Sequence, residues 1–106
     1  MPNIELVTLT KGEVHSLSGH DRGLAAREMF ELGRLDSAPE PVTVRAPDNL
    51  DALSPSFVQG LFADSVHSLG RERFYTHYKF DVAAHLRTDI DLGVNRVLMQ
   101  RKIAGT

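Results

Sequence analysis

The clearest alternation of apolar and polar residues lies at Val42 to Ala46. Val42, Val44 and Ala46 alternate with polar side chains, which is the pattern of a strand with one face on the core. From residue 57 onward one stripe recurs at helical spacing instead, formed by Phe57, Val58, Leu61, Phe62, Ser65, Val66 and Leu69. We therefore predict a strand, a short loop and a helix between Val42 and Leu69, with the rest of the chain organised around them.

The predicted helix has clear signals at both ends. Ser54 is a good N-cap, because its hydroxyl can accept a hydrogen bond from a first-turn N–H. Pro55 suits the first helical position, where a missing N–H costs nothing. Gly70 is the expected C-cap. Leu50 and Leu53 are expected to fill the gap between strand and helix.

Before this segment the pattern predicts a hairpin and then a helix. β-Branched residues favour a strand over Ile4–Leu9, and a turn at Lys11-Gly12-Glu13 leads into a second short strand over Val14–Leu17. Apolar residues then return at helical spacing between Gly23 and Leu35, with Asp21 as the expected N-cap.

After Gly70 the pattern predicts another strand and a last helix. Aromatic and β-branched residues alternate with others in Arg71–Phe80, which favours a strand. Asp81 caps a helix whose apolar positions are Leu86, Ile90, Val94 and Val97. Gly93 weakens the middle of this helix, and the sequence allows a break near Thr88 to Asp91.

The order of these elements predicts an α/β fold with at least one parallel, right-handed crossover. We expect a small mixed sheet of four or five strands with helices mainly on one face. The 106 residues correspond to a single domain over 1–106.

Composition excludes several kinds of site. The chain has no cysteine, which removes disulfides and thiolate chemistry and is compatible with a cytoplasmic protein. No signal peptide or membrane span is recognisable. The net charge is −2, the pI is near 6.2 and the positive residues are scattered, so we expect no nucleic-acid binding.

The sequence offers few residues for catalysis or metal binding. The five histidines lack the spacing of a zinc site, so no metal is expected. His20, Asp21 and Ser56 could form a hydrolase-like trio if the fold brought them together. However, there is no Gly-x-Ser-x-Gly motif and no Gly-rich phosphate loop.

Two segments carry a resemblance to a known family. LSPSFVQGLF at 53–62, followed by LGRERF at 69–74, resembles the STAS-like domain family of unknown function, and the likeness covers most of the chain. The matching positions are Gly19, the helix from Gly23 to Leu35, Ser54, Ser56, Phe57, Leu69, Gly70, Arg73 and Phe74. The family usually ends its central strand in a pattern like Leu-Asp-Phe-x-Gly-Val, whereas this chain has VRAPDNL at 44–50, which suggests a divergent member.

The resemblance implies a sheet backed by helices and no cofactor. STAS domains proper include bacterial anti-sigma-factor antagonists, in which a serine at the start of the equivalent helix is phosphorylated by a partner kinase. Ser54 and Ser56 are therefore candidate phosphorylation sites, although the Ser-Pro sequence favours Ser54 as an N-cap alone. In such an alignment the phosphoacceptor could also fall on Pro55, which would leave Ser56 as the substitute.

The preferred hypothesis is a non-enzymatic, regulatory protein-binding module of bacterial signalling or transcription control. Its partner would be another protein, such as a kinase-like ATP-binding protein. The expected binding surface comprises Asp48, Asn49, Ser54, Ser56, Phe57 and Gln59. Two alternatives stay open: a small hydrolase that uses His20, Asp21 and Ser56, and an oligomeric adaptor that pairs through a sheet edge or an aromatic strand near Tyr75 to Tyr78. The sequence leaves the oligomeric state open.

Overall fold

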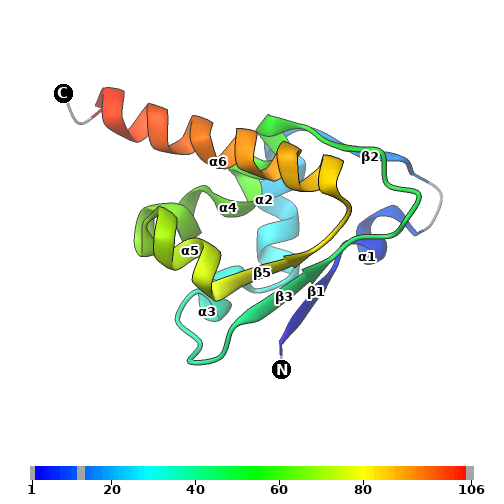
Figure 1. The fold of residues 1–106 in the computed structure, drawn as a ribbon, viewed down its shortest axis with the longest axis horizontal. Helices are drawn as coiled ribbons and strands as arrows, with labels where there is room; N and C mark the ends of the chain where they lie inside the picture. The colour runs from blue at the N-terminus through cyan, green and yellow to red at the C-terminus, as the bar shows by residue number, and fades with distance from the viewer. Residues whose placement is uncertain (1, 12–13, 105–106) are drawn as a thin grey trace.

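The computed structural model of the chain describes residues 2–11 and 14–104. Its elements, in order, are β1 (Asn3–Glu5), α1 (Val7–Thr10), β2 (Ser16–Leu17), α2 (His20–Met29), α3 (Leu32–Leu35), β3 (Val42–Arg45), β4 (Ala52–Leu53), α4 (Pro55–Leu69), α5 (Arg71–His77), β5 (Tyr78–Asp81) and α6 (Ala84–Ala104). Strands and helices are thus interspersed along the chain, as the sequence predicts for an α/β fold (Figure 1).

The strands form two small parallel sheets. One sheet has the strand order β1-β3-β5, and β2 pairs with β4 in the other. The register of the larger sheet places Val44 between Ile4 and Phe80. A single mixed sheet of four or five strands is therefore not confirmed: in the described residues five strands divide between two sheets, and every pairing is parallel.

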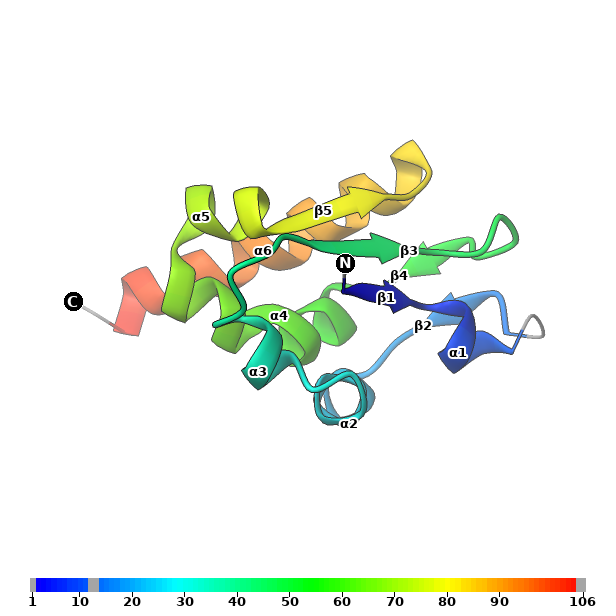
Figure 2. The ribbon, with the colours of Figure 1, turned by 90° about the horizontal axis from the view of Figure 1, so that it is seen from below.

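The helices that connect the strands of the larger sheet pack against one of its two faces. Because β1, β3 and β5 are added in one direction, right-handed crossovers place the connecting helices on the same face. In Figure 1 these strands lie below α4 and α6, and Figure 2, seen from below, shows β5 in front of α6.

The other face of this sheet is open and polar. The strand positions alternate between buried residues (Ile4, Val42, Val44 and Tyr78) and exposed or half-buried ones (Asn3, Glu5, Thr43, Arg45, Lys79 and Asp81). Arg45 and Asp81, which are register partners, form an ion pair at 3.5 Å across this face. Parallel sheets are usually covered on both faces, so this open face is unusual for the class.

Helix α4 is the centre of the molecule and packs between α2 and α6. A Cβ atom on Gly60 would lie 2.2 Å from the carbonyl oxygen of His20, and one on Gly23 would lie 2.9 Å from the Gly60 Cα. On the other side, a Cβ on Gly93 of α6 would lie 2.4 Å from the Val58 side chain. Gly93 therefore serves close helix packing, and α6 continues through it without a break.

The predicted N-terminal hairpin is wrong. β1 ends at Glu5, and the Leu6 N–H donates to the carbonyl oxygen of Arg45 at 2.9 Å, so β1 is paired with β3. The chain then turns into the short helix α1, and β2 pairs with β4 rather than with β1. The predicted first strand forms only at its start, and its partner is β3, 40 residues away and parallel, which the local pattern does not show. Two residues of the predicted turn, 12 and 13, lie outside the described residues.

Two further elements differ from prediction. The helix expected to run to Leu35 stops at Met29, because Glu31 adopts φ 56° and separates α2 from α3. It begins after Gly19, so Asp21 lies in its first turn and does not cap it. The strand expected over Arg71–Phe80 is a helix as far as His77 and a strand only from Tyr78.

Candidate functional site

The loop between β3 and β4 (residues 46–51, the β3–β4 loop) leads into the start of α4. In open α/β sheets, binding residues gather beyond the carboxyl ends of the strands, and this loop follows the carboxyl end of β3. Asp48, Asn49 and Asp51 are exposed, whereas Leu50 and Leu53 are buried as predicted. The loop is thus anchored in the core by Leu50 and exposes the polar side chains on either side of it.

The first turn of α4 has the predicted geometry. Ser54 is the N-cap in an extended conformation, and its Oγ accepts a hydrogen bond from the Phe57 N–H at 3.1 Å. Pro55 occupies the first helical position, and Gly70 is the C-cap with φ 79°. The Oγ atoms of Ser54 and Ser56 are 3.2 Å apart, and both side chains are half-buried.

One predicted surface residue lies in the core. Phe57 is only 1% exposed, since it belongs to the apolar face that α4 turns inward, so its expected place on the binding surface is wrong. Its contribution is to fix the first turn of α4. Gln59 is half-buried and stays at the margin of the surface.

Two histidines hold the backbone of the β3–β4 loop. His15 Nδ1 lies 3.0 Å from the Asn49 carbonyl oxygen, and His85 Nε2 lies 3.1 Å from the Leu50 carbonyl oxygen. Because a carbonyl oxygen can only accept, each of these ring nitrogens is the donor. The Asp51 N–H in turn donates to the His15 carbonyl oxygen at 2.7 Å. The loop is therefore tied to two segments far away in the sequence.

Strand β4 and the N-cap of α4, which follow the loop, are held in the same way. Asp89 of α6 accepts a hydrogen bond from the Leu53 N–H at 3.0 Å, and the Ser54 N–H donates to the Leu17 carbonyl oxygen at 2.9 Å. These contacts fix the backbone from Asn49 to Ser54 in one conformation. The exposed side chains of Asp48, Asn49 and Asp51 are thus presented in a preorganised arrangement, which lowers the entropy lost when a partner binds.

A buried polar network lies behind α4 and was not foreseen from the sequence. Arg27 Nη2 donates to Asp36 at 2.6 Å, and Arg27 Nη1 donates to Ser65 at 2.8 Å. Ser65 donates to the same carboxylate at 2.6 Å, and so does the hydroxyl of Tyr78. The side chains of Arg27 and Asp36 are 12% and 8% exposed. The network joins α2, α4 and β5 through the single carboxylate of Asp36, the residue that follows α3.

Two tyrosines are held in their neutral form. Burial, then the hydrogen bond to Asp36, raises the pKa of Tyr78 above its ordinary value. Burial, then the hydrogen bond to Asp91, raises the pKa of Tyr75 in the same way. Both hydroxyls donate to a carboxylate, so they act as structural donors at neutral pH.

The residues of the hydrolase alternative are not joined. In the described part of the chain, no hydrogen bond links His20, Asp21 and Ser56, and the Ser56 hydroxyl is paired with Ser54 instead. His20 and Asp21 are exposed on the first turn of α2. Among residues 2–11 and 14–104, no group of three or more His, Asp or Glu side chains is placed to hold a metal ion.

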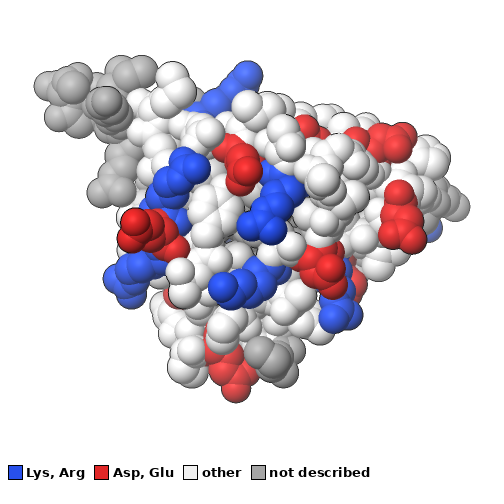
Figure 3. Space-filling view, viewed as in Figure 1, with Lys and Arg blue, Asp and Glu red and all other residues white. Residues whose placement is uncertain are grey.

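The visible surface carries a mixture of charges. On the face shown in Figure 3, Lys and Arg side chains alternate with Asp and Glu rather than gathering into one patch. Within the described residues, no helix combines the length and the apolarity that crossing a bilayer requires.

Comparison of the chain with models of known protein families, with curated proteins and with solved structures finds no match.

Proposed function

We propose that this chain is a non-enzymatic, STAS-like regulatory module that recognises another protein through the β3–β4 loop and the first turn of α4. The observation that carries the proposal is that His15 and His85 hold this loop and that Asp89 holds β4 directly after it. A polar loop held by contacts from distant elements is suited to recognition, because little order has to be gained on binding.

The resemblance to the STAS-like family is the second support. It rests on LSPSFVQGLF and LGRERF, and its best-defined feature is a serine at the start of a helix. Two serines occupy the first turn of α4. By analogy with the anti-sigma-factor antagonists, the proposed partner is a kinase-like ATP-binding protein in the cytoplasm of a bacterium.

Ser56 is the proposed modification site within this surface. The Ser54 hydroxyl is engaged as the N-cap, so phosphorylating it would replace the cap of the central helix. Ser56 is not the cap, and a phosphate there would meet a helix N-terminus that favours negative charge. The modification would add nearly two negative charges to a surface that already carries Asp48 and Asp51.

Affinity capture from a lysate of the source cells tests the proposal. Wild type is compared with Asp48→Lys and with Glu40→Lys, a matched reversal of an exposed acid before β3. We expect wild type and Glu40→Lys to retain the same protein, and Asp48→Lys to lose it by about tenfold or more, because one misplaced interfacial charge costs over 1 kcal/mol. Equal capture by Asp48→Lys, or no specific protein with wild type, would contradict the proposal.

The same assay tests the proposed modification. Ser56→Asp should reduce capture, because it places a charge in the middle of the proposed surface. Ser68→Asp, at the opposite end of α4 and exposed, is the control and should leave capture unchanged. If both variants behave alike, Ser56 has no special role in binding.

A further inference from the structure

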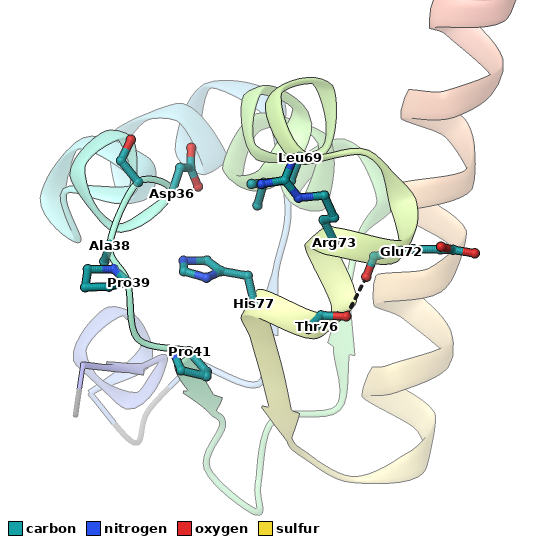
Figure 4. A pocket seen from close by; sticks show the side chains of 10 residues that line it. Asp36, Ala38, Pro39, Pro41, Leu69, Glu72, Arg73, Thr76 and His77 are labelled. Atoms are coloured by element: carbon teal, nitrogen blue, oxygen red, sulfur yellow. Dashed lines mark hydrogen bonds between the residues drawn. The ribbon is translucent and has the colours of Figure 1, made fainter.

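A pocket of about 530 Å³ lies at the amino ends of β3 and β5, which is the end of the larger sheet opposite to the β3–β4 loop. One wall is the segment from Asp36 to Pro41, and the other is formed by the end of α4 and by α5 (Figure 4). Pockets that bind small molecules typically enclose about 300 to 1,000 Å³. No part of this pocket belongs to the proposed protein-binding surface.

His77 enters the pocket with a defined hydrogen-bonding state. Its Nε2 lies 2.6 Å from the carbonyl oxygen of Leu35, and because that oxygen can only accept, Nε2 carries the proton. Nδ1 of the neutral ring is then an acceptor, and no hydrogen bond to it is found within the described residues. The ring also packs edge-on against Tyr78 at 5.1 Å. His77 therefore offers one fixed acceptor to a ligand.

Arg73 supplies a positive charge one helical turn away. It is four residues before His77 on α5, so the two side chains lie on the same face of the helix. Among the described residues its guanidinium forms no hydrogen bond or ion pair. Figure 4 shows Arg73 extending toward the Asp36 side of the pocket and the Glu72 carboxylate directed away from it.

The nearby carboxylate of Asp36 does not neutralise Arg73. Both of its oxygens are already engaged, one by Arg27 and the other by Ser65 and Tyr78. The rest of the lining mixes apolar residues (Ala38, Pro39, Pro41 and Leu69) with polar ones (Ser37, Glu72 and Thr76). Pro39 and Pro41 form a stiff apolar wall, because their φ angles are fixed. The pocket thus combines one unpaired cation, one oriented acceptor and a rigid apolar wall.

We propose that this pocket binds a small hydroxycarboxylate. Its carboxylate would pair with the Arg73 guanidinium, which accommodates two carboxylate oxygens at once. Its hydroxyl would donate to Nδ1 of His77, and its carbon chain would rest on Pro39 and Pro41. Neighbouring side chains on one helix face are separated by about 5 to 6 Å, which suits a ligand with its two polar groups a few carbons apart.

Three matched probes test the ligand class. The ¹⁵N-labelled protein is titrated with 3-hydroxybutyrate, with butyrate, which lacks the hydroxyl, and with butane-1,3-diol, which lacks the carboxylate. We expect 3-hydroxybutyrate to give saturable shifts of the Asp36–His77 wall amides with a Kd of about 1 to 10 mM, as suits so small a ligand. Butyrate and the diol should each bind about tenfold or more weakly, because each leaves one polar group of the pocket unpaired.

Two arginine variants on the same helix locate the site. Arg73→Gln should weaken 3-hydroxybutyrate binding by about tenfold or more. Arg71→Gln is the control, because Arg71 donates to Asn95 and lies over the Tyr75 ring instead of lining the pocket. The proposal is overturned if 3-hydroxybutyrate gives no saturable shift up to about 50 mM, if butyrate binds equally well, or if Arg73→Gln binds like wild type.

Discussion

At the scale of single residues, Asp36 is the carboxylate on which the buried polar contacts converge. It receives hydrogen bonds from Arg27, Ser65 and Tyr78. Arg27 and Glu31 are four residues apart, a spacing that would pair them on one continuous helix, but the chain turns at Glu31, and Arg27 reaches Asp36 instead. Glu31 pairs with Arg34 at 3.4 Å on the surface. Only the folded arrangement reveals which acid is structurally important.

Replacing Asp36 with Asn should strongly destabilise the protein. The variant keeps the size of the side chain but leaves the nearly buried Arg27 without its close counter-charge, so we expect a loss of about 3 kcal/mol in the free energy of unfolding. Asp64→Asn is the control, since Asp64 faces the same arginine at 3.7 Å but is 73% exposed, and such pairs contribute under about 1 kcal/mol. Urea denaturation measures both. Similar losses in the two variants would contradict the central role of Asp36.

The raised pKa values of Tyr75 and Tyr78 predict a loss of stability at high pH. In the unfolded chain a tyrosine ionises near pH 10, whereas in the folded chain burial and a carboxylate partner keep it neutral. Stability from this source is fully present below about pH 10 and falls as the pH rises further, by up to about 1.4 kcal/mol per pH unit for each tyrosine. Urea midpoints between about pH 8 and 12 should show this decline.

Tyr75→Phe supplies the control for this pH dependence. Removing one of the two ionisable hydroxyls should roughly halve the tyrosine contribution to the decline above about pH 10. A variant with the same pH dependence as wild type would show that Tyr75 ionises equally readily in the folded and unfolded chain.

At the scale of elements, the crossing of α2 and α4 depends on two glycines in contact. Gly60→Ala should destabilise the protein by about 1 to 3 kcal/mol, because the added Cβ would lie 2.2 Å from the His20 carbonyl oxygen and force the helices apart. Gly33→Ala is the matched control in a helix where nothing lies within 4 Å of the new Cβ. It should be neutral or stabilising by up to about 1 kcal/mol. Thermal unfolding of both variants gives the comparison.

The N-cap of α4 can be tested separately from its packing. Ser54→Ala should lower the unfolding free energy by about 1 kcal/mol, because the Phe57 N–H loses its acceptor. Ser68→Ala, near the other end of the helix, should have little effect, since its exposed hydroxyl bonds only to a carbonyl of the preceding turn. Equal effects in a denaturant titration would mean that Ser54 is not acting as a cap.

The elements that the sequence predicts correctly are those with local signals. The alternation in Val42–Arg45, the Ser54-Pro55 start and Gly70 each specify their structure within a few residues. The strand prediction for Arg71–Phe80 fails because its spacing fits two structures. Phe74, Thr76, Tyr78 and Phe80 are two residues apart, as on one face of a strand, but Phe74 and Tyr78 are also four residues apart, as on one face of a helix. The β2–β4 pairing joins positions 36 residues apart, and no local pattern can show it.

The candidate site shows the same division between local and distant signals. The polar loop and the serine helix start are visible in the sequence. The bracing of the loop and of β4 is not visible, because His15, His85 and Asp89 lie 34 to 36 residues from their partners in the sequence. Phe57 was misplaced because the expected binding surface was drawn through the whole helix start as far as Phe57, although its own place on the apolar stripe of α4 indicates burial.

At the scale of the whole molecule, the two proposed sites lie at opposite ends of the strands of one sheet. The β3–β4 loop follows the carboxyl end of β3, and the pocket of Arg73 and His77 precedes the amino ends of β3 and β5. The helices cover one face of the sheet and leave the other polar and open (Figure 2). This arrangement leaves room for a protein partner and a small ligand to bind at the same time.

The central claim, that the β3–β4 loop and the start of α4 form the protein-binding surface, is tested most directly by amide hydrogen exchange. The chain is measured alone and in complex with the protein that it captures from its source cells. We predict that the amides gaining protection lie between Asp48 and Phe57, while those of the open sheet face, such as Thr43 and Lys79, are unchanged. Protection gained only outside Asp48–Phe57, or the failure of the chain to capture any protein, would contradict the claim.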